Sequence, residues 1–154
     1  MRNSVDVHNF LVERDVQHEV VKVRGRLRSA ERIASVLDLP PAQVGKVMVY
    51  ETDKGPVAAI VASGTVPDPE RLRKALRATE IKGTTQARAS QLSEYLGEAV
   101  PPAGLPTGFK VVVDRNLTGE DVLYFAGGEA SAILKLRSAD LVRATAAKVA
   151  AIAT

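Results

Sequence analysis

Hydrophobic and polar residues along this chain follow two different periods, and the switches between them predict its helices and strands. Val7, Phe10 and Leu11 recur at helical spacing, so a helix is expected over about residues 5–13. Ser29 and Ser138 are expected to act as N-caps, and Gly97 as a C-cap. The other predicted helices run over about residues 29–37, from Asp68-Pro69 onward, over 87–96 and through 138–143.

Shorter apolar or alternating segments predict the strands. The turn "TDKG" between residues 46–51 and 56–62 predicts a hairpin. Further strands are expected over about residues 17–23, 80–82 and 149–152, and in "FKVVVD", "VLYFA" and "AILKL". Helices and strands therefore interleave irregularly, with hairpin neighbours. This favours a mixed α/β (α+β) fold over a doubly wound parallel sheet, and the lack of linkers or repeats predicts one domain over residues 1–154.

Composition sets a few limits. With 154 residues, 45% of them hydrophobic and 25% charged, the chain can bury one substantial core. The absence of cysteine excludes disulfides, thiolate metal ligands and cysteine nucleophiles. No signal peptide or membrane-spanning run is visible, so a cytoplasmic location without a membrane partner is expected.

The common catalytic motifs are missing. There is no Gly-x-Gly-x-x-Gly, no phosphate loop and no Gly-x-Ser-x-Gly. His8 and His18, the only histidines, are too far apart for a metal-binding pair on one helix, and we expect them to be structural or exposed. The sequence predicts neither a metal nor a cofactor.

The net charge is +3, and part of it is regularly placed. In "VVKVRGRLR", Lys22, Arg24, Arg26 and Arg28 recur at every second position, so they would share one face if the segment is extended. That face is either a solvated edge strand protected by charge, or a stripe that follows a nucleic-acid backbone.

The stretch "QVGKVMVY" places a charge at the start of an apolar strand. Lys46 shares a face with Met48 and Tyr50. Its ammonium group either lies at the rim, with the stem on apolar surface, or faces an anion. The preceding Gly45 would allow another backbone or a ligand to approach closely.

Two loops are further candidates. "GEAVPPAGLP" is rich in proline and glycine, and is either a preorganised binding loop or a plain connector. In "YFAGGEASAILKL", the backbone amides of Gly127 and Gly128 would either bind an oxyanion or merely form a turn.

Taken in order, these segments resemble the YbaK family, free-standing relatives of the editing insertion domain of bacterial prolyl-tRNA synthetase. The similarity runs from about Phe10 to Ile152. It includes "LPPAQVGKVMVY", the proline-rich loop near residue 100, "VVVD" and "YFAGGEASAILKLRSADL". "HEVVKV" followed by Arg28-Ser29-Ala30-Glu31 matches the family's extended segment and helix start.

The resemblance implies a central mixed, largely antiparallel sheet or partial barrel flanked by helices, and a trans-acting hydrolase that removes wrong amino acids from tRNA. The expected substrate is tRNA-Pro carrying a small residue such as alanine or cysteine. The expected partners are aminoacyl-tRNA and prolyl-tRNA synthetase, with no DNA. Lys46 matches the lysine that relatives use near the tRNA 3′ end, and Gly97 and Pro101 fit a Gly-x-x-x-Pro loop that positions the ester.

The same resemblance gives the remaining site residues. The substrate pocket is expected to include Met48, Tyr50, Ile60, Ala62, Ser63, Ala99, Val100, Pro102, Gly104, Gly127 and Gly128. RNA contacts are expected from the alternating basic residues described above, Lys22, Arg24, Arg26 and Arg28, if they follow a nucleic-acid backbone.

Two departures keep other functions open. Glu98 and Ala99 stand where two glycines are usual, and Val47 stands where relatives often carry serine, threonine or asparagine. A non-catalytic module that binds tRNA or a synthetase is therefore the alternative, and an enzyme acting on a small metabolite is a third reading.

Overall fold

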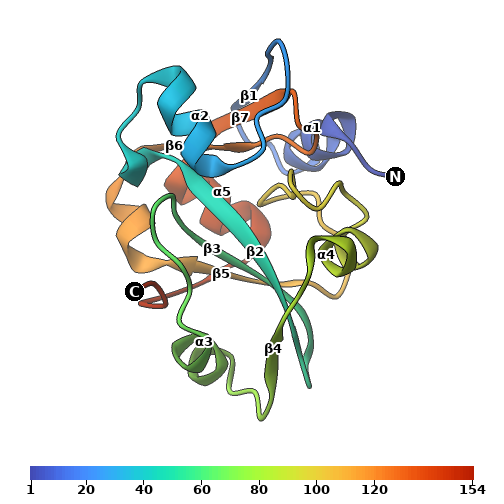
Figure 1. The fold of residues 1–154 in the computed structure, drawn as a ribbon, viewed down its shortest axis with the longest axis vertical. Coiled ribbons are helices and arrows are strands. Elements are labelled where there is room, and N and C mark those ends of the chain that lie inside the picture. Colours follow the sequence, from blue (N-terminus) through green and yellow to red (C-terminus); the bar gives the residue numbers. More distant parts are fainter.

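The computed structural model describes residues 1–154, in which two β-sheets are flanked by five α-helices (Figure 1). The larger sheet is mixed, with strand order β4-β2-β3-β5-β8, and the smaller is antiparallel, with order β1-β7-β6. A parallel bridge between Val44 and Tyr124 joins them. The strands are β1 (His18–Lys22), β2 (Gly45–Thr52), β3 (Gly55–Ala62), β4 (Ile81–Gly83), β5 (Lys110–Asp114), β6 (Val122–Ala126), β7 (Ala132–Arg137) and β8 (Lys148–Ala150).

The helices begin largely where polar caps predict. The Ser29 hydroxyl accepts a hydrogen bond from the amide of Arg32, and the Asp68 carboxylate accepts two at the start of the next helix. The helices are α1 (Ser4–Glu13), α2 (Ala30–Leu37), α3 (Pro69–Leu76), α4 (Gln86–Ser93) and α5 (Ser138–Thr145), with short 3-10 helices at Pro41–Gln43 and Arg115–Gly119.

Two predicted helix boundaries, the end of α4 and the start of α5, were wrong. Helix α4 stops at Ser93, and Glu94 takes the left-handed conformation, with φ 67°, that the sequence assigned to Gly97. Ser138 is the first residue of α5 and not its cap, because its hydroxyl donates to the carbonyl of Glu120.

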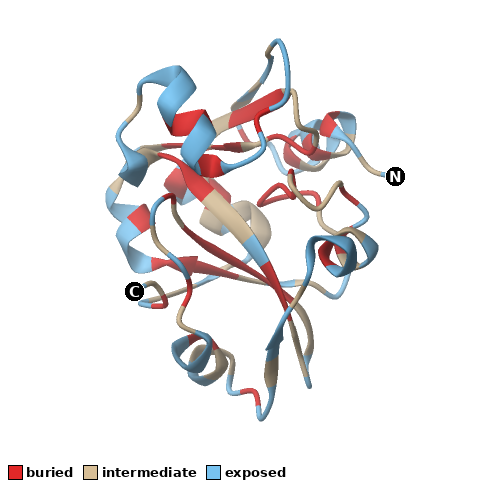
Figure 2. Ribbon diagram, in the orientation of Figure 1, coloured by how far each residue is buried: buried red, intermediate tan, exposed pale blue.

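The main core lies between the two sheets. It combines Val7 and Leu11 of α1 with Ile60 of β3 and with Phe125 and Leu134 of the smaller sheet. A second cluster forms on the other side of the larger sheet, around Tyr50, Val57 and Leu72. Figure 2 shows the interior strands as the most continuously buried segments. Strand β3 is consequently buried on both faces, as its run of apolar residues requires.

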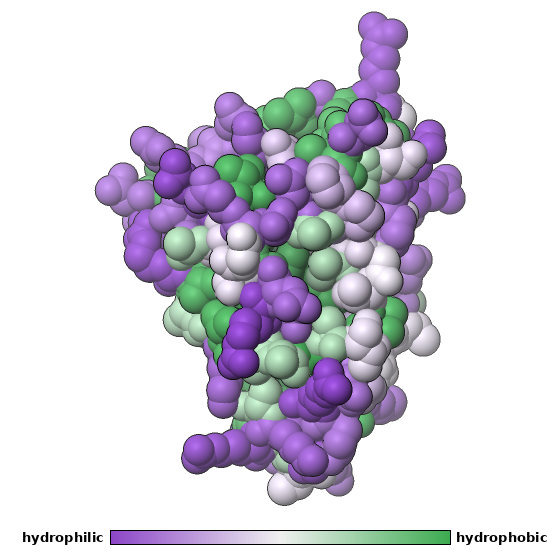
Figure 3. Space-filling model, turned by 90° about the vertical axis from the view of Figure 1, so that its left-hand side faces the viewer, coloured by the Kyte–Doolittle hydropathy of each residue, from purple (hydrophilic) through white to green (hydrophobic).

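The mixed α/β class predicted from the sequence is confirmed, with the strands divided between two open sheets in place of one central sheet. None of the helices is long and apolar enough to cross a bilayer. On the face seen in Figure 3, hydrophilic residues dominate the outline and hydrophobic ones form smaller patches between them.

The feature that matters most for a site is the uneven pairing of β2. One edge pairs with β3 along its full length, from Gly45 to Thr52. On the other edge, β4 pairs only with residues 50–52. The segment before residue 50 therefore leaves part of a strand edge without a partner strand, beside α4 and the loop that follows it (Figure 1).

Candidate functional site

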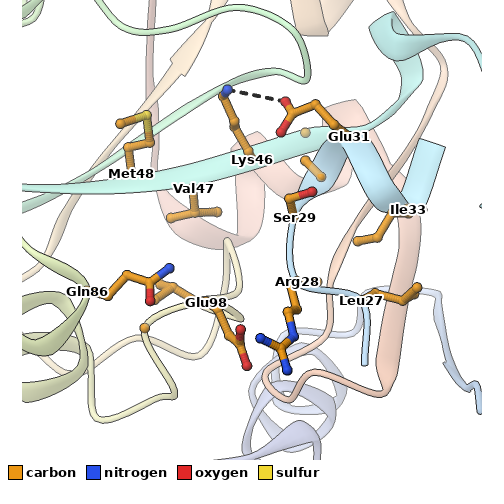
Figure 4. A pocket seen from close by; sticks show the side chains of 15 residues that line it. Leu27, Arg28, Ser29, Glu31, Ile33, Lys46, Val47, Met48, Gln86 and Glu98 are labelled. Atoms are coloured by element: carbon orange, nitrogen blue, oxygen red, sulfur yellow. Dashed lines mark hydrogen bonds and ion pairs between the residues drawn. The ribbon is translucent and has the colours of Figure 1, made fainter. Parts of the chain in front are cut away.

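Two adjoining cavities follow this open edge of β2, with volumes of about 150 and 260 Å³. They share the residues Val47, Met48, Gln86, Gly97 and Val100. The smaller cavity is completed by Leu27, Arg28, Ser29, Ala30, Glu31, Ile33, Gly45, Lys46, Glu98 and Ala126 (Figure 4). The larger one is completed by Val49, Tyr50, Gly83, Thr84, Thr85 and Ala89.

The backbone of β2 offers polar groups to these cavities. The Thr84 hydroxyl donates to the carbonyl oxygen of Val49 at 2.7 Å, so that carbonyl points to the open edge. In an antiparallel strand, residues two apart direct their N–H and C=O groups to the same side. The N–H and C=O of Val47 therefore face this edge as well, where no strand pairs with them.

Lys46 is held at the rim of the smaller cavity by a carboxylate. Its Nζ lies 3.3 Å from Oε2 of Glu31, and its side chain is only 22% exposed. The same Glu31 oxygen accepts a hydrogen bond of 2.8 Å from the amide of Gly64. Figure 4 shows Lys46 and Met48 projecting from one face of β2 and Val47 from the other. The ammonium group is thus fixed at the strand's start and not free in solvent.

The electrostatics of Glu31 follow from these contacts. Partial burial would raise the pKa of the Glu31 carboxyl, but hydrogen bonds from the Gly64 amide, its own amide and Lys46 together leave that pKa below its usual value. Glu31 therefore stays charged at neutral pH and keeps the ammonium of Lys46 oriented.

Two glycines in the site are required by close packing. A Cβ atom on Gly97 would lie 2.3 Å from the carbonyl oxygen of Gln86, so only glycine lets the loop approach the start of α4. A Cβ atom on Gly45 would lie 2.1 Å from the Phe125 ring. The glycine before Lys46 is therefore explained by an aromatic neighbour from the other sheet.

The structure brings several of the predicted site residues together around the cavities. These are Lys46, Met48, Tyr50, Gly97, Val100 and Arg28.

Other predicted pocket residues lie elsewhere. Pro102 and Gly104 line a separate cavity of about 310 Å³ on the side of Phe10. The remaining predicted residues line none of these cavities: Ala62 is half-buried, and the others are buried, namely Ile60, Ser63, Ala99 and Pro101. The Ser63 hydroxyl donates to the carbonyl of Pro41.

Gly127 and Gly128 do not line the site either. The amide of Gly127 donates to the carbonyl of Ala132 in the turn before β7, so it is not free to polarise a substrate. Gly128 packs against the start of α1, close to Val7. Of the two readings left open by the sequence, the turn describes this segment.

The condition for four basic residues to share one face, an extended segment, is not met. Strand β1 ends at Lys22, and Gly25 has a positive φ of 78° that breaks the alternation. Lys22 pairs with Glu129, while Arg26 pairs with Glu98, a lining residue of the smaller cavity. Arg24 and Arg28 are exposed and take part in no ion pair. Their contact with RNA remains a prediction.

Sequence reasoning missed much of the lining. It gave no site role to Glu31, Gln86 or Thr84, and it treated Glu98 only as a departure from a family pattern. The available signal was the helix start Ser29–Glu31, which the resemblance already contained. Nothing local indicates that Gln86, the first residue of α4, lies against Gly97.

The two histidines come together, which the sequence did not suggest. Nδ1 of His8 lies 2.9 Å from Nε2 of His18, whose other ring nitrogen contacts the carbonyl of Val16. No group of three or more histidine, aspartate or glutamate side chains is placed to hold a metal ion.

Fold and site together define a mixed α/β domain with a small cavity at an open strand edge and a paired lysine at its rim. The chain belongs to the aminoacyl-tRNA editing domain family, whose model matches residues 25–144. The predicted kinship with editing domains is thereby confirmed.

Comparisons with individual proteins support membership of this family. Proline–tRNA ligases of Streptococcus thermophilus are 26% identical over 102 residues, which is 66% of this chain but 16% of the ligase, so the chain spans only a small part of those enzymes. The solved structure of the hypothetical protein APE2540 superposes with a TM-score of 0.91 at 21% identity, covering 97% of this chain and 99% of the other. A proposed trans-editing enzyme for prolyl-tRNA synthetase gives 0.86 at 22% identity, covering 98% and 96%. At these identities the structural likeness concerns the fold.

Proposed function

We propose that this protein is a trans-acting deacylase that hydrolyses mischarged aminoacyl-tRNA, with tRNA-Pro carrying alanine or cysteine as the first substrates to test. The observation that carries the proposal is the cavity at the open edge of β2, which combines Lys46 at its rim with backbone groups of Val47. Aminoacyl-tRNA and prolyl-tRNA synthetase as partners, and a cytoplasmic location, belong to the same proposal.

The chemistry needs little from side chains. An aminoacyl ester is already activated, so positioning and stabilisation of the developing oxyanion can supply most of the rate. Water adds to the ester carbonyl, the bond from that carbon to the ribose oxygen breaks, and the released ribose oxygen takes a proton. The products are the free amino acid and tRNA with its terminal hydroxyl restored.

Each part of the site has a role in this scheme. Lys46, steadied by Glu31, would contact the phosphate or ribose of the terminal adenosine. The N–H of Val47 faces the open edge and would donate to the ester carbonyl oxygen. Gly97 and Val100 close the opposite wall, so the loop after α4 would fix the amino-acid side chain.

The size of the cavity favours small amino acids. A space of about 150 Å³ accommodates a short side chain with its ester. Apolar pockets separate substrates that differ by one small group by only about 1–3 kcal/mol, so alanine, serine and cysteine should all be cleaved, with kcat/KM values within roughly 200-fold of one another.

The decisive experiment mixes the purified protein with a panel of mischarged tRNAs and follows the loss of the ester bond over time. The panel combines alanine, cysteine, serine and proline with tRNA-Pro, and alanine with tRNA-Ala. Turnover of alanyl- or cysteinyl-tRNA-Pro well above the buffer rate, with prolyl-tRNA-Pro spared, is the expected result. No turnover on any member would overturn the proposal.

A second candidate is a module that binds tRNA or a synthetase without cleaving the ester. It is favoured by Arg24 and Arg28, which are exposed and form no ion pair, and Arg28 lines the smaller cavity. It predicts tRNA binding that weakens steeply with salt and with replacement of these arginines by glutamine, and no ester loss in the same panel.

A further inference from the structure

Glu98 is a carboxylate placed inside the smaller cavity. Its side chain is only 12% exposed, and it follows the tightly packed Gly97. The next two residues, Ala99 and Val100, are buried, and the amide of Ala99 donates to the carbonyl of Leu96. The backbone that carries this carboxylate is therefore firmly held, and so little exposure makes a cationic partner necessary.

The partner in this structure is Arg26, which comes from a segment far away in the sequence. Its neighbours are anchored, because the amides of Val23 and Leu27 donate to the carbonyls of Ser131 and Ala130. Its own side chain is 53% exposed, so the guanidinium can leave Glu98 by rotating into solvent. The anion is thus fixed within the cavity while its cation is displaceable.

An aminoacyl-tRNA end carries the complementary charges. Its amino acid has one cation, the α-ammonium group, and the adjoining RNA has phosphates. If the ammonium replaces the guanidinium at Glu98, Arg26 becomes free to contact a phosphate, so neither charge is left unpaired. Lys46 is not needed for this exchange, because Glu31 holds it on the other face of β2 (Figure 4).

We infer that Glu98 binds the α-ammonium group of the aminoacyl ester in exchange for Arg26, and that the site therefore selects esters with a free amino group over N-acylated ones. The inference rests on the proposed function, since it names the substrate group that the same cavity recognises. It assigns a specificity role to the residue that stands where relatives carry glycine.

The test uses analogues that cannot be hydrolysed. Alanine is linked through an amide to 3′-amino-3′-deoxyadenosine, once with a free amino group and once N-acetylated, and both are titrated calorimetrically into the full chain. The free-amine analogue should bind about tenfold more tightly, as expected for one charge-assisted contact. Glu98→Gln should bring the two affinities within about twofold by weakening only the free-amine analogue.

Two further variants keep the test decisive. Glu94→Gln removes a nearby carboxylate that lies outside both cavities, and it should retain the preference. Arg26→Gln removes the competing cation, so it should bind the free-amine analogue at least as tightly as the wild-type chain, even if Glu98→Gln fails to fold. Loss of the preference in Arg26→Gln, or equal binding of both analogues by the wild type, would overturn the inference.

A parallel cleavage assay separates this inference from the proposed function. Alanyl-tRNA-Pro and N-acetylalanyl-tRNA-Pro are compared under the same conditions. Cleavage of both at equal rates supports a deacylase and overturns the role of Glu98. Absence of cleavage together with ammonium-dependent binding overturns the deacylase and supports the role of Glu98.

Discussion

Two of the three lysine–glutamate pairs in this molecule have the same chemistry but opposite settings. In the pair at the cavity, Lys46 is the enclosed partner, 22% exposed, and Glu31 is 50% exposed. In the pair between β1 and the turn before β7, Lys22 is 59% exposed and Glu129 is 29% exposed. The first pair encloses an ammonium group and the second encloses a carboxylate.

The contacts of Glu129 show what the second arrangement does. One oxygen of Glu129 binds Lys22, and the other accepts a hydrogen bond from the amide of Ser4, the first residue of α1. Lys22 also donates to the Ser4 hydroxyl. The Lys22 hydrogen bond, followed by those from Ser4, lowers the pKa of Glu129 to about 2. This pair ties a helix start to a turn, whereas the pair at the cavity holds the ammonium group of Lys46 at the cavity rim.

The largest difference between the two pairs is expected when the side chain of Lys46 is removed. Lys46→Ala should lower kcat/KM for deacylation roughly 100-fold, because the charge proposed to hold the terminal adenosine is lost and the ester is no longer positioned. The midpoint of thermal unfolding should change by less than about 3 °C, since an ion pair whose carboxylate is half exposed adds little stability. Kinetics on mischarged tRNA and thermal denaturation measure the two effects.

Lys54→Ala is the matched control for this change. Lys54 is an exposed lysine in the turn of the β2–β3 hairpin and pairs with no carboxylate. It should keep wild-type kinetics. Equal losses of activity in both variants would mean that Lys46 acts only through net charge, and the contrast between the two lysine pairs would lose its meaning.

A change on the opposite wall of the cavity should have the next largest effect. In Gly97→Ala the added methyl group would meet the carbonyl of Gln86, which forces the loop away from α4 and costs about 2 kcal/mol of unfolding free energy. Activity should fall as well, since Gly97 lines both cavities and its loop moves. Gly119→Ala is the control, because a Cβ atom there meets nothing within 4 Å. Equal urea midpoints for the two variants would contradict the close contact seen at Gly97.

A smaller effect is expected when only the carboxylate that holds Lys46 is changed. Glu31→Gln keeps an acceptor for the amide of Gly64 but loses the charge that holds Lys46. We expect kcat/KM to fall by about fivefold, less than in Lys46→Ala, because the ammonium remains but samples more positions. A loss as large as that of Lys46→Ala would show that Glu31 itself acts on the substrate.

The local elements of this fold could be predicted because each has a local cause. The N-caps Ser29 and Asp68 and the "TDKG" turn mark their elements directly. The end of α4 could not be predicted in this way. Glu94 accepts the left-handed conformation there, while the nearby Gly97 is required for packing against Gln86. The sequence alone does not show whether a glycine is required for a left-handed backbone conformation or for close packing.

The site could be predicted only in part, for a similar reason. Lys46 was singled out because its strand has a recognisable pattern, and Gly97 because of the loop motif, and both line the smaller cavity. The carboxylates that pair with the basic residues come from distant segments. Glu98 is separated from Arg26 by 72 positions, and Glu129 from Lys22 by 107. The alternation of basic residues therefore suggested one shared face. In the structure, Lys22 and Arg26 are instead held by two separate carboxylates.

The smallest expected effect concerns the pair outside the cavity, and it appears in the pH dependence of stability. The pKa of Glu129 is lowered from 4.5 to about 2, so its ionised form is favoured by folding. Its stabilising contribution is fully present above pH 4.5 and is lost as the pH falls toward 2. Because both partners are partly exposed, Glu129→Gln should cost only about 1 kcal/mol at pH 7. The difference from the wild-type chain should shrink steadily below pH 4.5, as measured by urea unfolding between pH 2 and pH 7.

Deacylation at pH 7 should remain unchanged, because Glu129 lines neither cavity. A difference in stability that stays constant across this pH range would show that Glu129 contributes through its shape and not through its charge, and Lys22–Glu129 would no longer be the structural counterpart of Lys46–Glu31.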